Sequence, residues 1–148
     1  MLASNKISEG IAQLTNIAPV SQGVGTVNSA WVPTKNIHLI AAVIATGVLG
    51  ASATVDAKLQ QATDITGTGA KDITGKAITQ IVKATGDNKQ AIINLRSQEL
   101  DTNNGFAFVR LSITVGVAAS LVSAEVMAVP RYMPADTLNQ AAVVQVVA

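Results

Sequence analysis

Four segments of this chain alternate apolar and polar residues with a period of two. They are residues 53–60, 93–96, 108–115 and 122–128. Successive side chains of a β-strand point to opposite faces of the sheet, so this period predicts half-buried strands. Short strands separated by turn residues predict an all-β domain, either a β-sandwich or a jelly-roll-like fold.

Residues 37–45 differ from these segments because they are apolar on both faces. This pattern predicts a strand that lies centrally in a sheet or is covered by a partner. Glycine-rich turns follow at Gly47 and Gly50, and later at 66–69 and 86–88. The pair Asn104-Gly105 predicts a two-residue hairpin turn, because a type I′ turn requires positive φ at both central residues.

The chain divides by composition into an N-terminal arm at 1–26, a β-sandwich domain at 27–134 and a C-terminal tail at 135–148. The spacing of Ile7, Ile11 and Leu14 fits one short amphipathic helix. Gly10 and Pro19 weaken that interpretation, and an extended arm docked on a neighbouring subunit is the alternative.

The C-terminal tail is apolar and carries no charge from Thr137 onward. Its valines, Val143, Val144, Val146 and Val147, make it strand-prone. A bare segment of this kind promotes aggregation. We therefore expect the tail to be docked, either on its own domain or on another chain.

The charge content is low and balanced, with ten Lys and Arg against nine Asp and Glu, and 13% of all residues. A nucleic-acid-binding protein needs a basic stripe to neutralise phosphates, so we expect no nucleic-acid partner. The charged fraction is about half the usual share. A soluble monomer normally carries more surface charge, so the shortage predicts that other subunits cover much of the surface.

A membrane span is the main rival explanation for the low charge, because residues 36–55 contain no Asp, Glu, Lys or Arg. The apolar stretch is shorter than the roughly 20 residues that a spanning helix needs. It is interrupted by polar residues and glycines and has no basic flank to set its orientation. A buried strand followed by a glycine turn fits better, and we expect no membrane partner.

The residue types that carry catalysis are sparse. His38 is the single histidine, it stands beside the most apolar strand, and cysteine is absent. No motif supplies a partner for His38, so the sequence predicts neither a catalytic site nor an enzyme. Gly67-Thr-Gly69 lacks the Gly-Lys-Ser/Thr ending of a phosphate-binding loop, so we expect no nucleotide cofactor.

Two pairs of carboxylates, Asp64 with Asp72 and Glu99 with Asp101, are the candidates for acid–base work or for a surface cation. Each pair lies in or near a predicted turn, where a solvated carboxylate or an Asx-turn is the ordinary explanation. We therefore assign no metal ligands and no catalytic acid.

The candidate interface residues are the four aromatic side chains and two valines of the tail: Trp31, Phe106, Phe108, Tyr132, Val143 and Val146. Aromatic side chains are natural anchors of subunit interfaces. The alternative is that one sheet face packs on the core and the other on a terminal segment of the same chain.

The order of several short segments resembles a family of small structural proteins from the head-gene clusters of tailed bacteriophages and prophages. These segments are Trp31-Val-Pro-Thr-Lys-Asn-Ile-His38, Gln60-Gln-Ala-Thr-Asp64, Gly67-Thr-Gly-Ala-Lys71, Glu99-Leu-Asp-Thr-Asn-Asn-Gly-Phe106, Val109-Arg-Leu-Ser-Ile-Thr-Val115 and Pro130-Arg-Tyr132. They span residues 27–134 and carry no catalytic signature.

This resemblance implies a capsid-associated β-sandwich that decorates or cements the head shell as an oligomer. The expected partners are further copies of the chain, as a trimer or pentamer, and the major capsid protein. The expected location is the capsid surface of the virion, after assembly in the host cytoplasm. A head–tail connector or tail subunit, and a jelly-roll module that binds carbohydrate or the host, are the alternatives.

Overall fold

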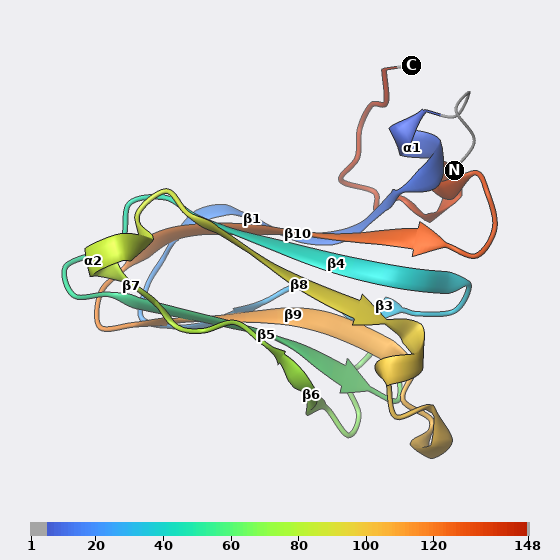
Figure 1. Cartoon of the computed structure of the whole chain (residues 1–148), viewed down its shortest axis with the longest axis horizontal. Coiled ribbons are helices and arrows are strands. Elements are labelled where there is room, and N and C mark those ends of the chain that lie inside the picture. Colours follow the sequence, from blue (N-terminus) through green and yellow to red (C-terminus); the bar gives the residue numbers. More distant parts are fainter. Residues whose placement is uncertain (1–5, 148) are drawn as a thin grey trace.

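Two antiparallel β-sheets pack face to face in the computed structural model, which describes residues 6–147 (Figure 1). The first sheet has the strand order β1 (Ala12–Gln22), β10 (Ser120–Pro130), β4 (Ile37–Thr46) and β8 (Gln90–Arg96). The second has the order β2 (Gly25–Asn28), β9 (Phe108–Gly116), β5 (Thr54–Ala62) and β6 (Lys71–Ala77). Two short strands complete it: β3 (Val32–Pro33) pairs with β9, and β7 (Ile81–Val82) pairs with β5.

The order of the strands is that of a jelly roll. The chain passes from one sheet to the other after β1, β3, β4, β7, β8 and β9, and every strand pair is antiparallel. This wrapping of eight strands into two layers, with β3 and β7 added to the second, is the double Greek key of jelly-roll domains. The predicted all-β sandwich is confirmed.

Helical structure is confined to single turns at the ends of the sandwich. These are α1 (Ile7–Gly10), α2 (Lys83–Gly86) and three 3₁₀ turns at Ser97–Glu99, Thr102–Asn104 and Ala135–Leu138. Among residues 6–147, no helix has the length and apolar character needed to cross a membrane.

The core lies between the sheets and contains the apolar members of the alternating segments. β10 alternates strictly, with Val122, Ala124, Val126 and Ala128 buried. β9 contributes Val109, Leu111, Ile113 and Val115, and β5 contributes Val55, Ala57 and Leu59. The period-two prediction is therefore confirmed for these strands, because every second side chain is removed from water.

From Ala12 onward the N-terminal segment is more integrated than the predicted arm at 1–26, whose residues 1–5 lie outside the described part of the chain. Residues 12–22 form the edge strand of the first sheet and pair with β10, and residues 25–28 pair with β9. The helix expected over Ile7–Leu14 is a single turn that ends at Gly10. Polar Thr15 is buried in β1, and this masks the period-two signal in the sequence.

The turn at Asn104-Gly105 also differs from the predicted hairpin. Thr102–Asn104 form a 3₁₀ turn, and Gly105 ends it with φ 80°. The flanking strands β8 and β9 belong to different sheets, so this connection crosses the sandwich and joins no adjacent pair. The glycine supplies the positive φ, but it serves as a helical cap.

Candidate interaction surface

The outward side of the first sheet carries a group of apolar side chains with polar ones among and around them. Directly paired residues share a face of a sheet, so the strand register defines this surface row by row. One row is Asn16, Glu125, Val43 and Ile92; the next is Gln13, Met127, Ala41 and Asn94. We call the outward side chains of these four strands the β10 face. Its apolar members are Leu39, Ala41, Val43, Ala45, Ile92, Leu121, Met127 and Val129, and its polar members are Gln13, Asn16, Ser21, Gln90, Asn94, Arg96, Ser123 and Glu125.

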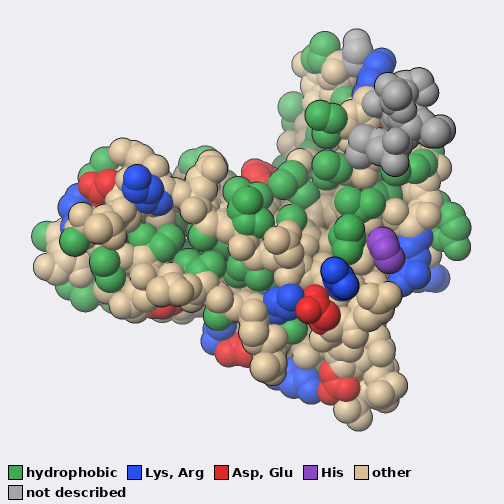
Figure 2. All heavy atoms as spheres, viewed as in Figure 1, with side chains coloured by type: hydrophobic (Ala, Val, Ile, Leu, Met, Phe, Trp, Pro, Cys, Tyr) green, Lys and Arg blue, Asp and Glu red, His purple; other side chains and the backbone are tan. Residues whose placement is uncertain are grey.

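Several large apolar side chains of the β10 face are open to water. Ile92 is 61% exposed, Leu121 is 45% exposed and Leu39 is 39% exposed. Figure 2 shows hydrophobic side chains gathered along the middle of the molecule, with charged ones mainly below them and around α2. A contiguous apolar surface of this kind is typical of a protein–protein contact.

The outward side of the second sheet is polar and satisfies its own hydrogen bonds. Lys58 Nζ lies 2.7 Å from Asp72 Oδ2, and Gln60 Nε2 donates to Asp72 Oδ1 at 2.8 Å. Arg110 Nε donates to Gln60 Oε1 at 2.9 Å. On the neighbouring strands, the hydroxyls of Thr26 and Thr114 lie 2.8 Å apart. The two outer faces of the sandwich thus differ in chemistry, and only the outer face of the first sheet has the exposed apolar side chains typical of a protein–protein contact.

Glu125 is the one carboxylate of the β10 face. Its strand neighbours are the uncharged Asn16 and Val43. Glu125 forms no ion pair among the described residues. Partial burial desolvates the Glu125 carboxyl and raises its pKa above the ordinary value. A carboxylate in this position favours a covering surface that offers it a cation or a hydrogen-bond donor.

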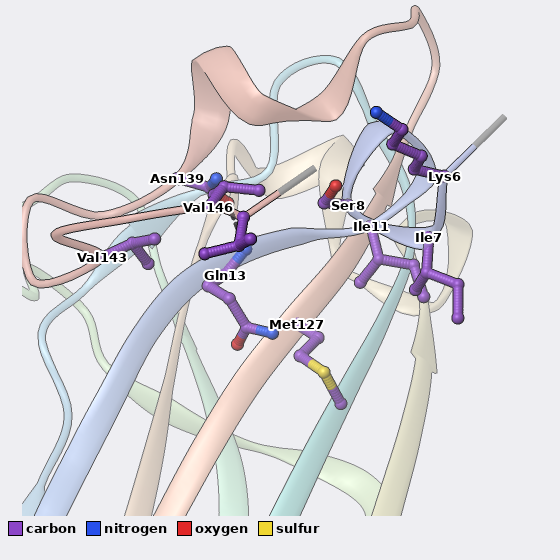
Figure 3. Close-up of a pocket in the computed structure, with 10 residues that line it drawn as sticks. Lys6, Ile7, Ser8, Ile11, Gln13, Met127, Asn139, Val143 and Val146 are labelled. Carbon is purple, nitrogen blue, oxygen red and sulfur yellow. Dashed lines mark hydrogen bonds between the residues drawn. The ribbon is translucent and has the colours of Figure 1, made fainter.

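A groove of about 730 Å³ adjoins one end of the β10 face (Figure 3). It lies between α1, the start of β1 and the C-terminal segment, and its apolar lining includes Ile7, Ile11, Met127, Val143 and Val146. A smaller hollow of about 220 Å³ shares Ile11 and Met127 with it and reaches Leu39 and Ala41. The groove and the β10 face are therefore continuous.

Backbone hydrogen bonds to Gln13 fix the C-terminal segment beside this groove. Gln140 N donates to Gln13 O at 2.7 Å, and Gln13 N donates to Asn139 Oδ1 at 2.8 Å. The Gln13 side-chain oxygen is buried with no hydrogen-bond donor among the described residues. An unsatisfied buried oxygen costs about 1–3 kcal/mol, so this part of the groove is suited to a donor from outside the chain.

The six interface residues predicted from the sequence lie in three places. Val143 and Val146 line the groove. Tyr132 is 71% exposed in the segment after β10. Phe106 is buried, with Lys71 Nζ 4.1 Å from its ring centroid, and Phe108 begins β9.

Trp31, the remaining aromatic candidate, is half-buried beside the second sheet. The Arg110 guanidinium carbon lies 4.6 Å from the centroid of its ring. Trp31, Phe106 and Phe108 thus lie away from the groove and the β10 face. Their role at an interface stays a prediction.

The sequence analysis did not identify Leu39, Val43, Ile92 and Glu125 as surface candidates. The available signal was the doubly apolar segment 37–45, whose outward side chains become Leu39, Ala41, Val43 and Ala45. These side chains share a surface with Ile92 and Glu125 because the strand order places β4 between β10 and β8. No local sequence pattern gives that order.

The four carboxylates considered for catalysis are each held by local hydrogen bonds. Asp64 Oδ1 accepts from Thr66 N, Thr66 Oγ1 and Thr68 N at 2.9, 2.7 and 3.1 Å. Hydrogen bonds from Thr68 and Thr66 lower the pKa of this carboxyl. Asp72, Glu99 and Asp101 form ion pairs with Lys58, Lys76 and Lys71. Between residues 6 and 147, no three or more His, Cys, Asp or Glu side chains form a group that could hold a metal ion.

Comparisons with known proteins give no family. No family model matches the sequence, and no curated protein matches it. Among solved structures, the fold is similar to the SPBc2 prophage-derived protein YomS, at 9% identity and a TM-score of 0.46, over 87% of this chain and 99% of that one.

Two further structures have similar folds. A Triatoma virus chain aligns at 5% identity and a TM-score of 0.47, over 93% of this chain and 72% of that one. TmCBM61 in complex with beta-1,4-galactotriose aligns at 10% identity and a TM-score of 0.40, over 76% and 70%. Likenesses at this level carry no argument about function, which therefore rests on the residues of this chain.

Proposed function

We propose that this protein is a structural subunit of a tailed-phage virion, and that it decorates and stabilises the capsid shell. The resemblance of residues 27–134 to head-gene structural proteins supports the assignment to a virion. The contrast between the β10 face and the polar outer face of the second sheet is the observation that supports an assembly role. In this proposal the β10 face contacts the shell, and the protein is located on the capsid surface.

The size of the β10 face is consistent with one contact among several. Four strands about 4.8 Å apart, over about seven residues of 3.3 Å each, give a surface of roughly 19 by 23 Å. A standard interface buries on the order of 800 Å² per partner, about twice this projected area. The adjoining groove and the C-terminal segment therefore have to contribute to any stable contact.

Apolar burial supplies the stabilisation in this proposal. Covering Ile92, Leu39 and Leu121 removes side chains that are each more than a third exposed in the single chain. Each apolar square ångström removed from water contributes about 25 cal/mol. A contact repeated over the shell multiplies this small gain, and it requires neither a cofactor nor a catalytic site.

The composition of purified particles tests the proposal. We expect the protein in stoichiometric amounts, in many copies on the head. Its absence from purified particles would overturn the proposal, and a single ring of copies at the neck would favour a connector.

A pair of charge insertions tests the face itself. Ile92→Glu introduces a carboxylate into the β10 face, and we expect this variant to be lost from particles. The control is Thr74→Glu on β6, an exposed residue on the other sheet. Equal incorporation of both variants would show that the β10 face does not contact the shell.

A further inference from the structure

Residues 141–147 form a strand-prone segment that has no pairing partner among the described residues. Residues 141–147 are two alanines, four valines and Gln145, with no charge, Pro or Gly. Val144 is 93% exposed and Val147 is 85% exposed. Among the described residues, the last backbone hydrogen bond of this segment runs from Val143 N to Gln140 O.

That bond closes a turn at residues 141–142, and the segment then runs beside α1 without pairing to its own sheet (Figure 1). The segment has the composition that pairs readily in β-structure. Its exposed valines and unpaired backbone are therefore available to another chain.

An unpaired sheet edge of matching character lies close to where this segment begins. β1 pairs with β10 on one side; on its other side, within residues 6–147, only Gln13 is bonded, to Asn139 and Gln140. Ala12–Gln22 contains no charged residue. Pro19 has no N–H, so pairing along this edge is confined to the stretch before it, residues 14–18.

The other edges of the sandwich are less suited to a seven-residue apolar strand. On β8, Lys76 Nζ donates to Asn94 O at 2.8 Å, so a lysine covers part of the edge. β6 carries Lys71, Asp72 and Lys76. β2 and β3 have only four and two residues, and β3 ends in Pro33. Charges and short strands of this kind protect edges against pairing.

We propose that residues 141–147 of one copy add as a β-strand to the free edge of β1, at residues 14–18, in a second copy. The occupant of this edge is then an identical chain, and main-chain hydrogen bonds link the copies. In the added strand Val144 and Val146 share one face, because side chains alternate. The inference depends on the proposed virion role only for where the assembly is located.

Site-specific crosslinking tests this contact, and the natural chain has no cysteine to interfere. Two single-cysteine variants, Asn16→Cys on β1 and Val144→Cys in the tail, are purified as full chains, mixed and treated with a short bis-maleimide. Each copy then has one thiol, so a product that contains both variants arises only between chains. We expect this mixed dimer, and no such product when Thr74→Cys on β6 replaces Asn16→Cys.

A proline substitution separates strand pairing from non-specific contact. Gln145→Pro in the Val144→Cys copy removes a backbone donor needed for pairing, and we expect it to abolish the mixed dimer. Gln145→Ala keeps the backbone donor, so the mixed dimer should still form. Gln145 makes no described hydrogen bond, so thermal unfolding of both variants should match that of the parent and exclude misfolding.

The inference is overturned if Asn16→Cys crosslinks no better than Thr74→Cys, or if Gln145→Pro leaves the mixed dimer unchanged. It is also overturned if a double-cysteine copy crosslinks only within itself, since the tail would then lie on its own β1. Particle composition is measured separately. If the crosslink fails but the protein is present in particles, the addition of the tail to β1 of a second copy is overturned and the proposed function is not.

Discussion

Glu125 on β10 lies directly opposite Val43 on β4, so a carboxylate and an isopropyl group are neighbours on an outward sheet face. Asn16 of β1 is its neighbour on the other side. Sheets commonly pair a carboxylate with an oppositely charged residue across strands. Here neither neighbour is a cation, and desolvation by partial burial disfavours the charged form of Glu125 and raises its pKa.

Replacing Glu125 with Gln should increase the free energy of unfolding at about pH 7. A carboxyl whose pKa is raised by folding stabilises the folded state when protonated, and this contribution is lost as the pH rises through the folded pKa. The glutamine in the variant does not ionise, so its folded state is not destabilised as the pH rises. Urea unfolding at about pH 7 and about pH 4 measures it, and the gain over wild type should shrink at the lower pH. A gain that is equal at both values would contradict the assigned cause.

The ion-paired carboxylates have the opposite effect on stability. Hydrogen bonds and charge from Lys58, Lys83 and Lys71 lower the pKa values of Asp72, Asp87 and Asp101. The backbone N–H of Arg96, followed by Lys76, lowers the pKa of Glu99. A lowered carboxyl pKa contributes stability above the unfolded pKa, and this is lost as the pH falls through the folded value. We therefore expect the free energy of unfolding to decrease below about pH 4.

Asp87→Asn provides the matched variant for this acid effect. The Asp87 carboxylate accepts from Leu49 N at 2.9 Å and from Lys83 Nζ at 2.6 Å. The substitution removes one contributing group, so the decrease in stability on acidification should be smaller than in wild type. Urea titrations at several pH values measure both slopes, and identical slopes would exclude Asp87 as a contributor.

Thr46→Val should lower the free energy of unfolding by about 1–3 kcal/mol, because it removes a buried hydroxyl that has three partners. Thr46 Oγ1 donates to Gly86 O at 2.6 Å or to Lys89 O at 3.1 Å, and it accepts from Lys89 N at 3.1 Å. Thr46→Ser keeps the hydroxyl and should cost less. Thermal unfolding compares the two, and an equal loss would contradict the role assigned to the hydroxyl.

Leu111→Ala should lower the free energy of unfolding by about 2–5 kcal/mol, because it opens a cavity between the sheets. Leu111 is fully buried on β9. Leu121 is an outward leucine on the β10 face, so Leu121→Ala should change the free energy of the single chain by less than about 1 kcal/mol. Urea unfolding of both variants checks this, and similar losses would contradict the placement of Leu121 on the surface.

Gly67→Ala should destabilise the loop between β5 and β6. Gly67 has φ +89°, and an added Cβ would lie 2.6 Å from Trp31 Nε1, so both the backbone and Trp31 would have to shift. Gly105→Ala is the control, because its φ of +80° is similar but the space around it is open. Trp31 is the only tryptophan, and its fluorescence should change in Gly67→Ala and stay unchanged in Gly105→Ala.

The sequence was most informative where alternation and burial agree. Val109, Leu111 and Ile113 alternate with polar residues and are buried. The apolar residues of β10 follow the same pattern. In a two-layer sandwich each strand has one wet face, so the period is visible in the sequence alone. β1 was missed because buried Thr15 interrupts the apolar set, and its identity as a strand depends on pairing with distant β10.

The candidate surface was predictable only in part. The valine-rich tail stood out as apolar and uncharged, and the structure places Val143 and Val146 in the groove. The β10 face combines β1, β10, β4 and β8, which are far apart in the chain. No local pattern specifies which strands become neighbours, since that depends on how the loops cross the sandwich.

The sequence by itself determined that this chain is an all-β protein with little charge and an uncharged, strand-prone end, because composition and period are properties of the residues alone. Only the tertiary structure decided that the two outer faces differ in chemistry and that Glu125 lies among apolar side chains. It also decided that the tail begins beside the free edge of β1. These features depend on strand order and register, which long-range pairing selects.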